Sequence, residues 1–128
     1  MNHTEFEIKF FEKLLTAKKD FVEVMIPLAD AYTKKGLHEK GYALDLRLAE
    51  LMPTDESVFY NLACSEALLG KKKQALLSLR KSVELGYLDV IHMLNDPDLD
   101  SIQKTPEFLE IVNSLKTRLR RLSKERGH

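Results

Sequence analysis

Residues 56–89 read ESVFYNLACSEALLGKKKQALLSLRKSVELGYLD and repeat, at a shift of 34 positions, the residue pattern of the segment 22–55. Large, small and turn-forming residues recur in the same order at seven positions, where Met25, Leu28, Ala29, Gly36, Gly41, Leu48 and Leu51 correspond to Phe59, Leu62, Ala63, Gly70, Ala75, Ser82 and Leu85. A helix–turn–helix unit of this length leaves its apolar face uncovered when alone, so such units stack on neighbours. The repeat predicts an all-α protein built from antiparallel helix pairs.

The repeat also predicts how the chain is divided. We expect a single domain over 1–128, with one helix pair at 22–55 and a second at 56–89. Phe10 and Leu14 correspond to Leu44 and Leu48 at the same shift, which makes 4–19 the second half of a repeat without its first half. Thr4 with Glu7, and Asp20 with Glu23, have the spacing of capping boxes and predict the first two helix starts.

Beyond residue 89 the 34-residue pattern fails, and 90–126 is expected to be a capping region. It would contain a short helix near 88–94, an acidic turn and a long helix opened by Thr105 and Pro106. The long helix carries an apolar stripe of Phe108, Val112, Leu115, Leu119 and Leu122. This stripe is expected to close the open end of the stack.

Composition excludes several classes of function. Twenty basic and twenty acidic side chains cancel, so no net charge attracts the chain to nucleic acid or to a membrane surface. No stretch approaches the ~20 apolar residues that span a bilayer. The single cysteine, Cys64, cannot form an internal disulfide, and the first residues do not read as a signal peptide. We expect a cytoplasmic protein.

These features resemble the tetratricopeptide repeat. The resemblance lies in Tyr60-Asn61-Leu62-Ala63-Cys64, Leu69-Gly70, Gln74-Ala75-Leu76 and Leu85-Gly86-Tyr87. Asn95-Asp96-Pro97-Asp98-Leu99-Asp100 and Thr105-Pro106-Glu107-Phe108 are similar to the closing segment of many bacterial chains of this type. The resemblance implies a short right-handed solenoid with a C-terminal capping helix. It also implies a non-catalytic module that binds an unidentified protein or peptide.

In such repeats the first helix of each pair lines a concave binding face. Carried over to this sequence, the resemblance implies a groove lined by Glu23, Ile26, Asp30, Thr33, Lys34, Ser57, Tyr60, Asn61, Cys64, Ala67 and Leu68. Tyr60 is expected to point into the groove and Asn61 to reach its edge. The alternative is that the C-terminal helices cover this face and that Tyr60 is a core residue.

The sequence departs from the family in two respects. Asp45 stands where an aromatic or aliphatic residue is usual. Of the positions that grip a C-terminal carboxylate in one variant of the family, Asn61 fits, whereas Ile26, Asp30 and Ile91 do not. An acidic Asp30 would repel a carboxylate, so the sequence does not predict this carboxylate clamp.

Other residues give little indication of a metal site or a catalytic site. Asp96, Asp98, Asp100 and Glu107 have the spacing of calcium-loop ligands, but Ser101 replaces the required glycine, and helix capping explains the aspartates as well. Cys64 has no base assigned to it, and the histidines show no zinc spacing. We therefore predict no catalytic residue, no metal, no cofactor and no small-molecule substrate.

Two further functions remain open. Phe6, Phe10 and Phe11 on the unpaired first helix would support a homo-oligomer if they face solvent. Basic residues on the last helix would contact nucleic acid or an anionic surface, although cations near a helix C-terminus also complement its dipole. These are Lys116, Arg118, Arg120, Arg121, Lys124 and Arg126.

Overall fold

The protein is all-α, as its repeat predicts. The computed structural model describes residues 2–126, which form seven α-helices, one 3-10 helix and no strand. The elements are α1 (His3–Ala17), α2 (Val22–Lys34), α3 (His38–Leu51), α4 (Glu56–Leu68), α5 (Lys72–Glu84), α6 (Val90–Asn95), η1 (Pro97–Leu99) and α7 (Pro106–Arg126).

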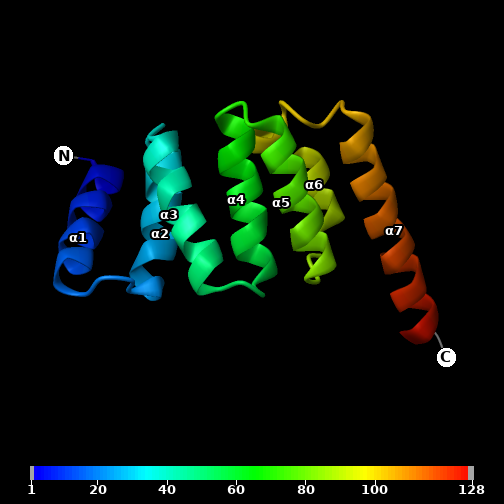
Figure 1. The fold of residues 1–128 in the computed structure, drawn as a ribbon, viewed down its shortest axis with the longest axis horizontal. Helices are drawn as coiled ribbons and strands as arrows, with labels where there is room; N and C mark the ends of the chain where they lie inside the picture. The colour runs from blue at the N-terminus through cyan, green and yellow to red at the C-terminus, as the bar shows by residue number, and fades with distance from the viewer. Residues whose placement is uncertain (1, 127–128) are drawn as a thin grey trace.

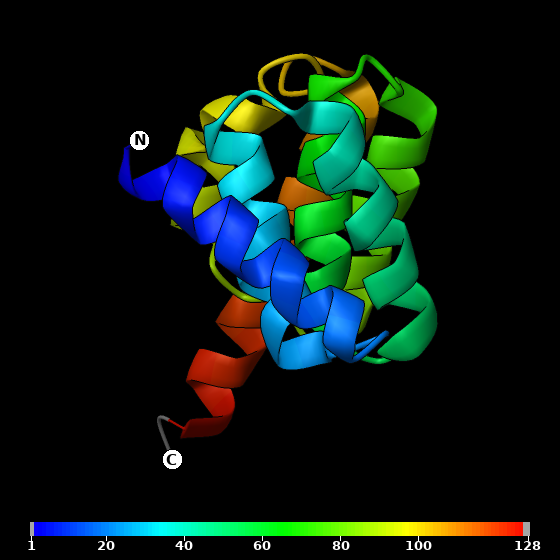
Figure 2. The same cartoon turned by 90° about the vertical axis from the view of Figure 1, so that its left-hand side faces the viewer.

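Helices that are neighbours in the sequence are neighbours in space over the first five helices. Each of α1 to α4 packs on the next, and short connections make the chain run back along the preceding helix (Figure 1). The order changes after α5, because η1 returns to contact α4 while α7 packs against α5 and α6. Figure 2 views the stack from the α1 end, and the end of α7 extends beyond the other helices.

Glycine turns end the first helix of each pair. Gly36 and Gly70 have φ angles of +82° and +76°, which a residue with a side chain adopts only under strain. After α2, the N–H of Gly36 donates to Thr33 O, and the N–H of Leu37 donates to Tyr32 O at 2.8 Å. These bonds satisfy the last carbonyls of α2 and turn the chain into α3.

Side-chain caps mark the start of some helices but not of α2, α3 or α5, and two predicted caps are wrong. Asp55 caps α4 by accepting from the N–H groups of Ser57 and Val58. At α1 the cap is Asn2, which accepts from the N–H of Glu5, so the Thr4–Glu7 capping box is not formed. Asp20 does not cap α2, because its carboxylate instead accepts from the Arg47 guanidinium at 2.6 and 3.0 Å.

The core consists of three clusters that follow one another along the stack. One cluster joins α1, α2 and α3 around Leu28 and Tyr32, and a second joins α2, α3 and α4 around Met25 and Leu48. The largest cluster joins α4 and α5 to α6, η1 and α7, and includes Phe108. α2 continues through Pro27 without ending, so residues beyond it keep their core positions.

The apolar stripe of α7 is only partly covered. Phe108, Val112 and Leu115 are buried and Leu119 packs at the edge of the core, but Leu122 is exposed. α7 therefore covers α5 with its first half. No helix within residues 2–126 combines the length and the apolar character needed to cross a membrane.

Candidate functional site

A cavity of about 570 Å³ opens between α2 and α4. α2 and α4 supply most of its wall, as expected of the first helix in each pair. α3 contributes Asp45 and Leu48, and the segment from α6 to η1 contributes His92, Asp96 and Asp98. The wall therefore includes elements that the groove prediction did not contain.

The cavity brings together seven of the eleven predicted groove residues, which are Ile26, Asp30, Thr33, Ser57, Tyr60, Asn61 and Cys64. Glu23 and Lys34 are exposed on α2 and do not line it. Ala67 is buried and Leu68 half-buried, and neither lines the cavity. The Ser101 hydroxyl donates to Ala67 O at 2.9 Å, so the segment after η1 lies against this end of α4. The predicted groove is thus closed at one end.

Tyr60 lines the cavity, as predicted, but it is a buried core residue and not an exposed aromatic side chain. It is only 5% exposed, and its ring stacks on that of Tyr87 with centroids 4.4 Å apart. Its hydroxyl donates to Asp96 Oδ2 at 2.7 Å. Burial, the neighbouring Cys64 and the bond to Asp96 raise the pKa of Tyr60. The contacting groups Tyr87 and Asp96 lie on either side of α6. Asn61, the next residue, is exposed and lines the cavity.

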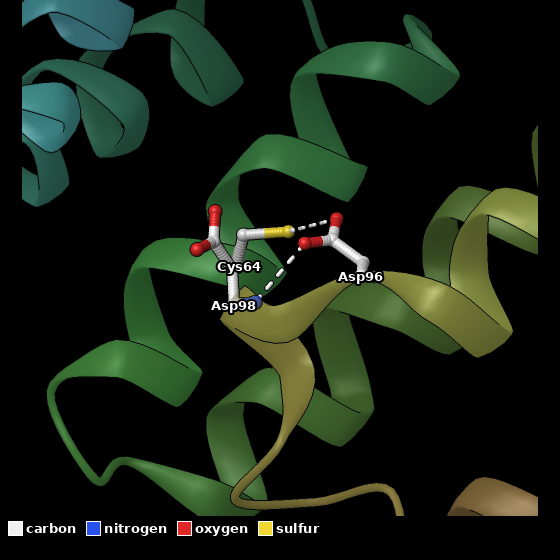
Figure 3. Close-up of side chains that lie close together, drawn as sticks. All are labelled: Cys64, Asp96 and Asp98. Atoms are coloured by element: carbon white, nitrogen blue, oxygen red, sulfur yellow. Dashed lines mark hydrogen bonds between the residues drawn. The ribbon is translucent and has the colours of Figure 1, made fainter.

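Cys64, Asp96 and Asp98 form a cluster in the cavity wall (Figure 3). The Cys64 thiol donates to Asp96 Oδ2 at 3.6 Å, and the Asp98 N–H donates to Asp96 Oδ1 at 3.0 Å. Candidate ligand atoms of the three residues lie within 4.8 Å of one another, and sulfur with carboxylate oxygens would suit zinc. Burial and then Asp96 raise the pKa of the Cys64 thiol, however, which opposes the thiolate that a metal requires. The contacts in place make the cluster a hydrogen-bonded cap for the turn into η1.

The calcium-loop spacing is not realised as a ligand set. In the described part of the chain, the metal-competent cluster contains Asp96 and Asp98 but neither Asp100 nor Glu107. Gln103 stands at a position where a calcium loop usually has an apolar residue. Its Nε2 donates to the carbonyls of Met93, Leu94 and Asp96. These residues therefore hold the turn between α6 and α7.

Asp45 is the functional candidate that the groove prediction missed. It lies on α3, is only 4% exposed and lines the cavity. Its Oδ2 accepts a hydrogen bond from the Ser65 hydroxyl. Burial raises the pKa of Asp45 to about 6, and the charges of Glu66 and Asp30 also raise it, while the Ser65 bond lowers it. The repeat favours an apolar residue at this position. The carboxylate there could therefore have identified Asp45 as a candidate from the sequence.

The cavity wall has an acidic character. It contains the carboxylates of Asp30, Asp45, Asp55, Asp96 and Asp98, and no lysine or arginine among the described residues that line it. Asp30 pairs with Lys34 at 3.0 Å, although both side chains are largely exposed. His92 Nε2 lies 3.3 Å from Asp96 Oδ2. Burial first, and then the charge of Asp96, raise the pKa of Asp98.

The basic residues of α7 lie elsewhere. Arg118 is half-buried and donates to the carbonyl oxygen of Val83 on α5, which is a structural contact. Lys116, Arg120, Arg121, Lys124 and Arg126 are exposed. They do not line the cavity.

No family model matches the chain, and no solved structure matches it significantly. The sequence is similar to a chloroplastic protein of Arabidopsis thaliana, with 28% identity over 80 residues. The match covers 60% of this chain and 24% of that protein, so the chain spans about a quarter of the length of this relative.

Proposed function

We propose that this protein is a non-catalytic, tetratricopeptide-like interaction module that binds a segment of a partner protein in the cavity between α2 and α4. The observation that supports the proposal is the cavity itself. It combines apolar side chains such as Ile26 and Val58 with exposed polar groups such as Asn61. Its volume of about 570 Å³ falls within the range of 300–1,000 Å³ that is usual for ligand sites.

The chemistry of the wall favours binding over catalysis. Cys64 is the one cysteine, and its thiol donates to Asp96 while its raised pKa disfavours the nucleophilic thiolate. A single cysteine, which cannot form an internal disulfide, also fits a reducing compartment. We therefore propose that the protein is cytoplasmic.

Selection of peptides from a random phage-displayed library tests the proposal. The selected peptide would be titrated into ¹⁵N-labelled protein, and the amide shifts would be mapped onto the helices. We expect changes at Ile26, Thr33, Ser57 and Asn61, which line the cavity. Changes confined to α5 and α7 would contradict the proposal.

Self-association through α1 is a second candidate, because two aromatic rings on this helix face solvent. Phe6 and Phe10 are 59% and 49% exposed, and their rings stack with centroids 6.2 Å apart. Phe11 instead packs against the core around Leu28. Sedimentation equilibrium over a wide concentration range tests this candidate. A dimer that the Phe6→Ser and Phe10→Ser double variant abolishes would support it, and a monomer at all concentrations would exclude it.

A further inference from the structure

We infer that the cavity recognises a cationic side chain of the partner segment, a lysine ammonium or an arginine guanidinium, which pairs with Asp45. This inference rests on the proposed function and names the chemistry of the ligand.

Asp45 has one carboxylate oxygen without a protein partner. Oδ2 accepts from Ser65, and no hydrogen bond reaches Oδ1 from residues 2–126. In this part of the chain, Nδ1 of His38 is the sole enclosed side-chain N or O atom without a partner. Oδ1 is therefore not sealed in the core, and it opens to the cavity that Asp45 lines. A buried acceptor that faces a cavity is positioned to receive a donor from a ligand.

The negative charges around Asp45 favour a positively charged donor. Asp30 acts on Asp45 and also on Asp98, since its charge raises the pKa of both carboxyl groups. No lysine or arginine of the described chain lines the cavity, and His92, the basic residue that does, lies against Asp96 with Nε2 3.3 Å from Oδ2. Lys34, a cationic side chain on the α2 rim, already pairs with the exposed Asp30. An entering cation would gain attraction from several carboxylates, whereas an entering carboxylate would be repelled.

A buried carboxylate without a cationic partner destabilises a folded protein. The repeat position of Asp45 favours an aromatic or aliphatic side chain, and either would avoid this cost. Residues that lower stability in this way are concentrated at functional sites. Glu66 offers a comparison, because it is equally buried at 4% exposure but accepts from both Tyr42 and Ser78 and does not line the cavity.

Four capped probe peptides of the form Gly-Ser-Ala-X-Ala-Ser-Gly, with X as arginine, lysine, norleucine or glutamate, test the inference. Each would be titrated to millimolar concentration into the full ¹⁵N-labelled chain. We expect the arginine and lysine peptides to shift the amides around Asp45, Ser65 and Asn61. Their dissociation constants should be at least about tenfold lower than that of the norleucine peptide, and the glutamate peptide should bind least.

Two variants complete the experiment. Asp45→Asn keeps the shape and the Ser65 bond, and should weaken the arginine and lysine peptides about tenfold without affecting the norleucine peptide. The control, Glu66→Gln, removes a buried carboxylate that does not line the cavity but whose charge acts on Asp45. It should weaken the arginine and lysine peptides less than Asp45→Asn does, and it should leave the other two peptides unaffected.

Failure of the inference and failure of the proposed function give different results. If the four peptides shift the cavity amides equally, the cavity binds peptides without selecting a cation, and only the inference is wrong. The inference is also wrong if none of the four binds while a library-selected peptide without lysine or arginine does. If library-selected peptides shift only amides outside the cavity, the proposed function is wrong as well.

Discussion

The hydroxyl of Tyr60 on α4 donates a 2.7 Å hydrogen bond to Oδ2 of Asp96, which lies between α6 and η1. The two residues are 36 positions apart in the sequence. The bond holds the segment from α6 to η1 against α4 and so fixes one wall of the cavity. Tyr60 therefore supports the cavity from within the core.

Removing this hydroxyl should destabilise the fold. Tyr60→Phe leaves a buried carboxylate oxygen with fewer donors, and we expect it to lower the free energy of unfolding by about 1–2 kcal/mol. Tyr60→Ala should cost about 3–5 kcal/mol, because it also removes the stacked ring. Urea unfolding measures both effects. Tyr42→Phe is the control, because the Tyr42 hydroxyl lies 3.5 Å from Glu66 Oε2 and should contribute less. Equal effects of the two Tyr→Phe changes would contradict the assignment.

Asp45 should make stability fall as pH rises from about 4 to about 6. Its folded-state pKa of about 6 lies above the ordinary 3.8, so the folded state holds the proton more tightly than the unfolded state between these values. Above pH 6 the ionised carboxyl group of Asp45 therefore lowers the free energy of unfolding relative to its protonated form. The loss is at most about 3 kcal/mol.

Asp45→Asn removes this effect and should raise the free energy of unfolding at pH 7.5. It should also flatten the dependence of stability on pH between about 4 and 6. Urea unfolding at a series of pH values measures this, with Asp100→Asn as the control because Asp100 is exposed. If Asp45→Asn destabilises the protein at pH 7.5, the carboxylate is not the destabilising group described here.

Cys64 should react slowly with thiol reagents in the folded protein. It is buried, and burial together with Asp96 and Asp98 raises the pKa of its thiol. Alkylation by iodoacetamide at pH 8 should be at least about a hundredfold slower than in urea-unfolded protein, because both access and the thiolate fraction are reduced. The rate is followed by mass spectrometry. Rapid alkylation of the folded chain would show that the Cys64–Asp96 bond does not persist in solution.

The repeat predicted the helices well, because the signals that begin and end them are local. Gly36, Gly70 and Asp55 act through their own backbone or through side-chain bonds within a few residues. Capping by Asp20 was mispredicted for the opposite reason. Arg47 on another helix captures its carboxylate, and a window of sequence around Asp20 does not contain that partner.

The candidate site was predictable to the extent that it follows the repeat. Ile26, Pro27 and Asp30 of α2 line the cavity, and so do the residues of α4 that correspond to them at the 34-residue shift, Tyr60, Asn61 and Cys64. Asp96 and Asp98 lie outside the repeat and reach the cavity only because η1 returns to α4. The burial of Tyr60 depends on the same return, so periodicity within α4 could not distinguish a core residue from an exposed one.

The most direct test of the central claim is the affinity of a library-selected peptide for two matched variants. Asn61 lines the cavity and Asn113 on α7 does not, although both asparagines are exposed on helices. Isothermal titration should show Asn61→Trp weakening the peptide at least about tenfold, since the indole fills the cavity, and Asn113→Trp leaving its affinity unchanged. Full affinity in the Asn61→Trp variant, with its fold intact by circular dichroism, would contradict the assignment of the cavity as the binding site.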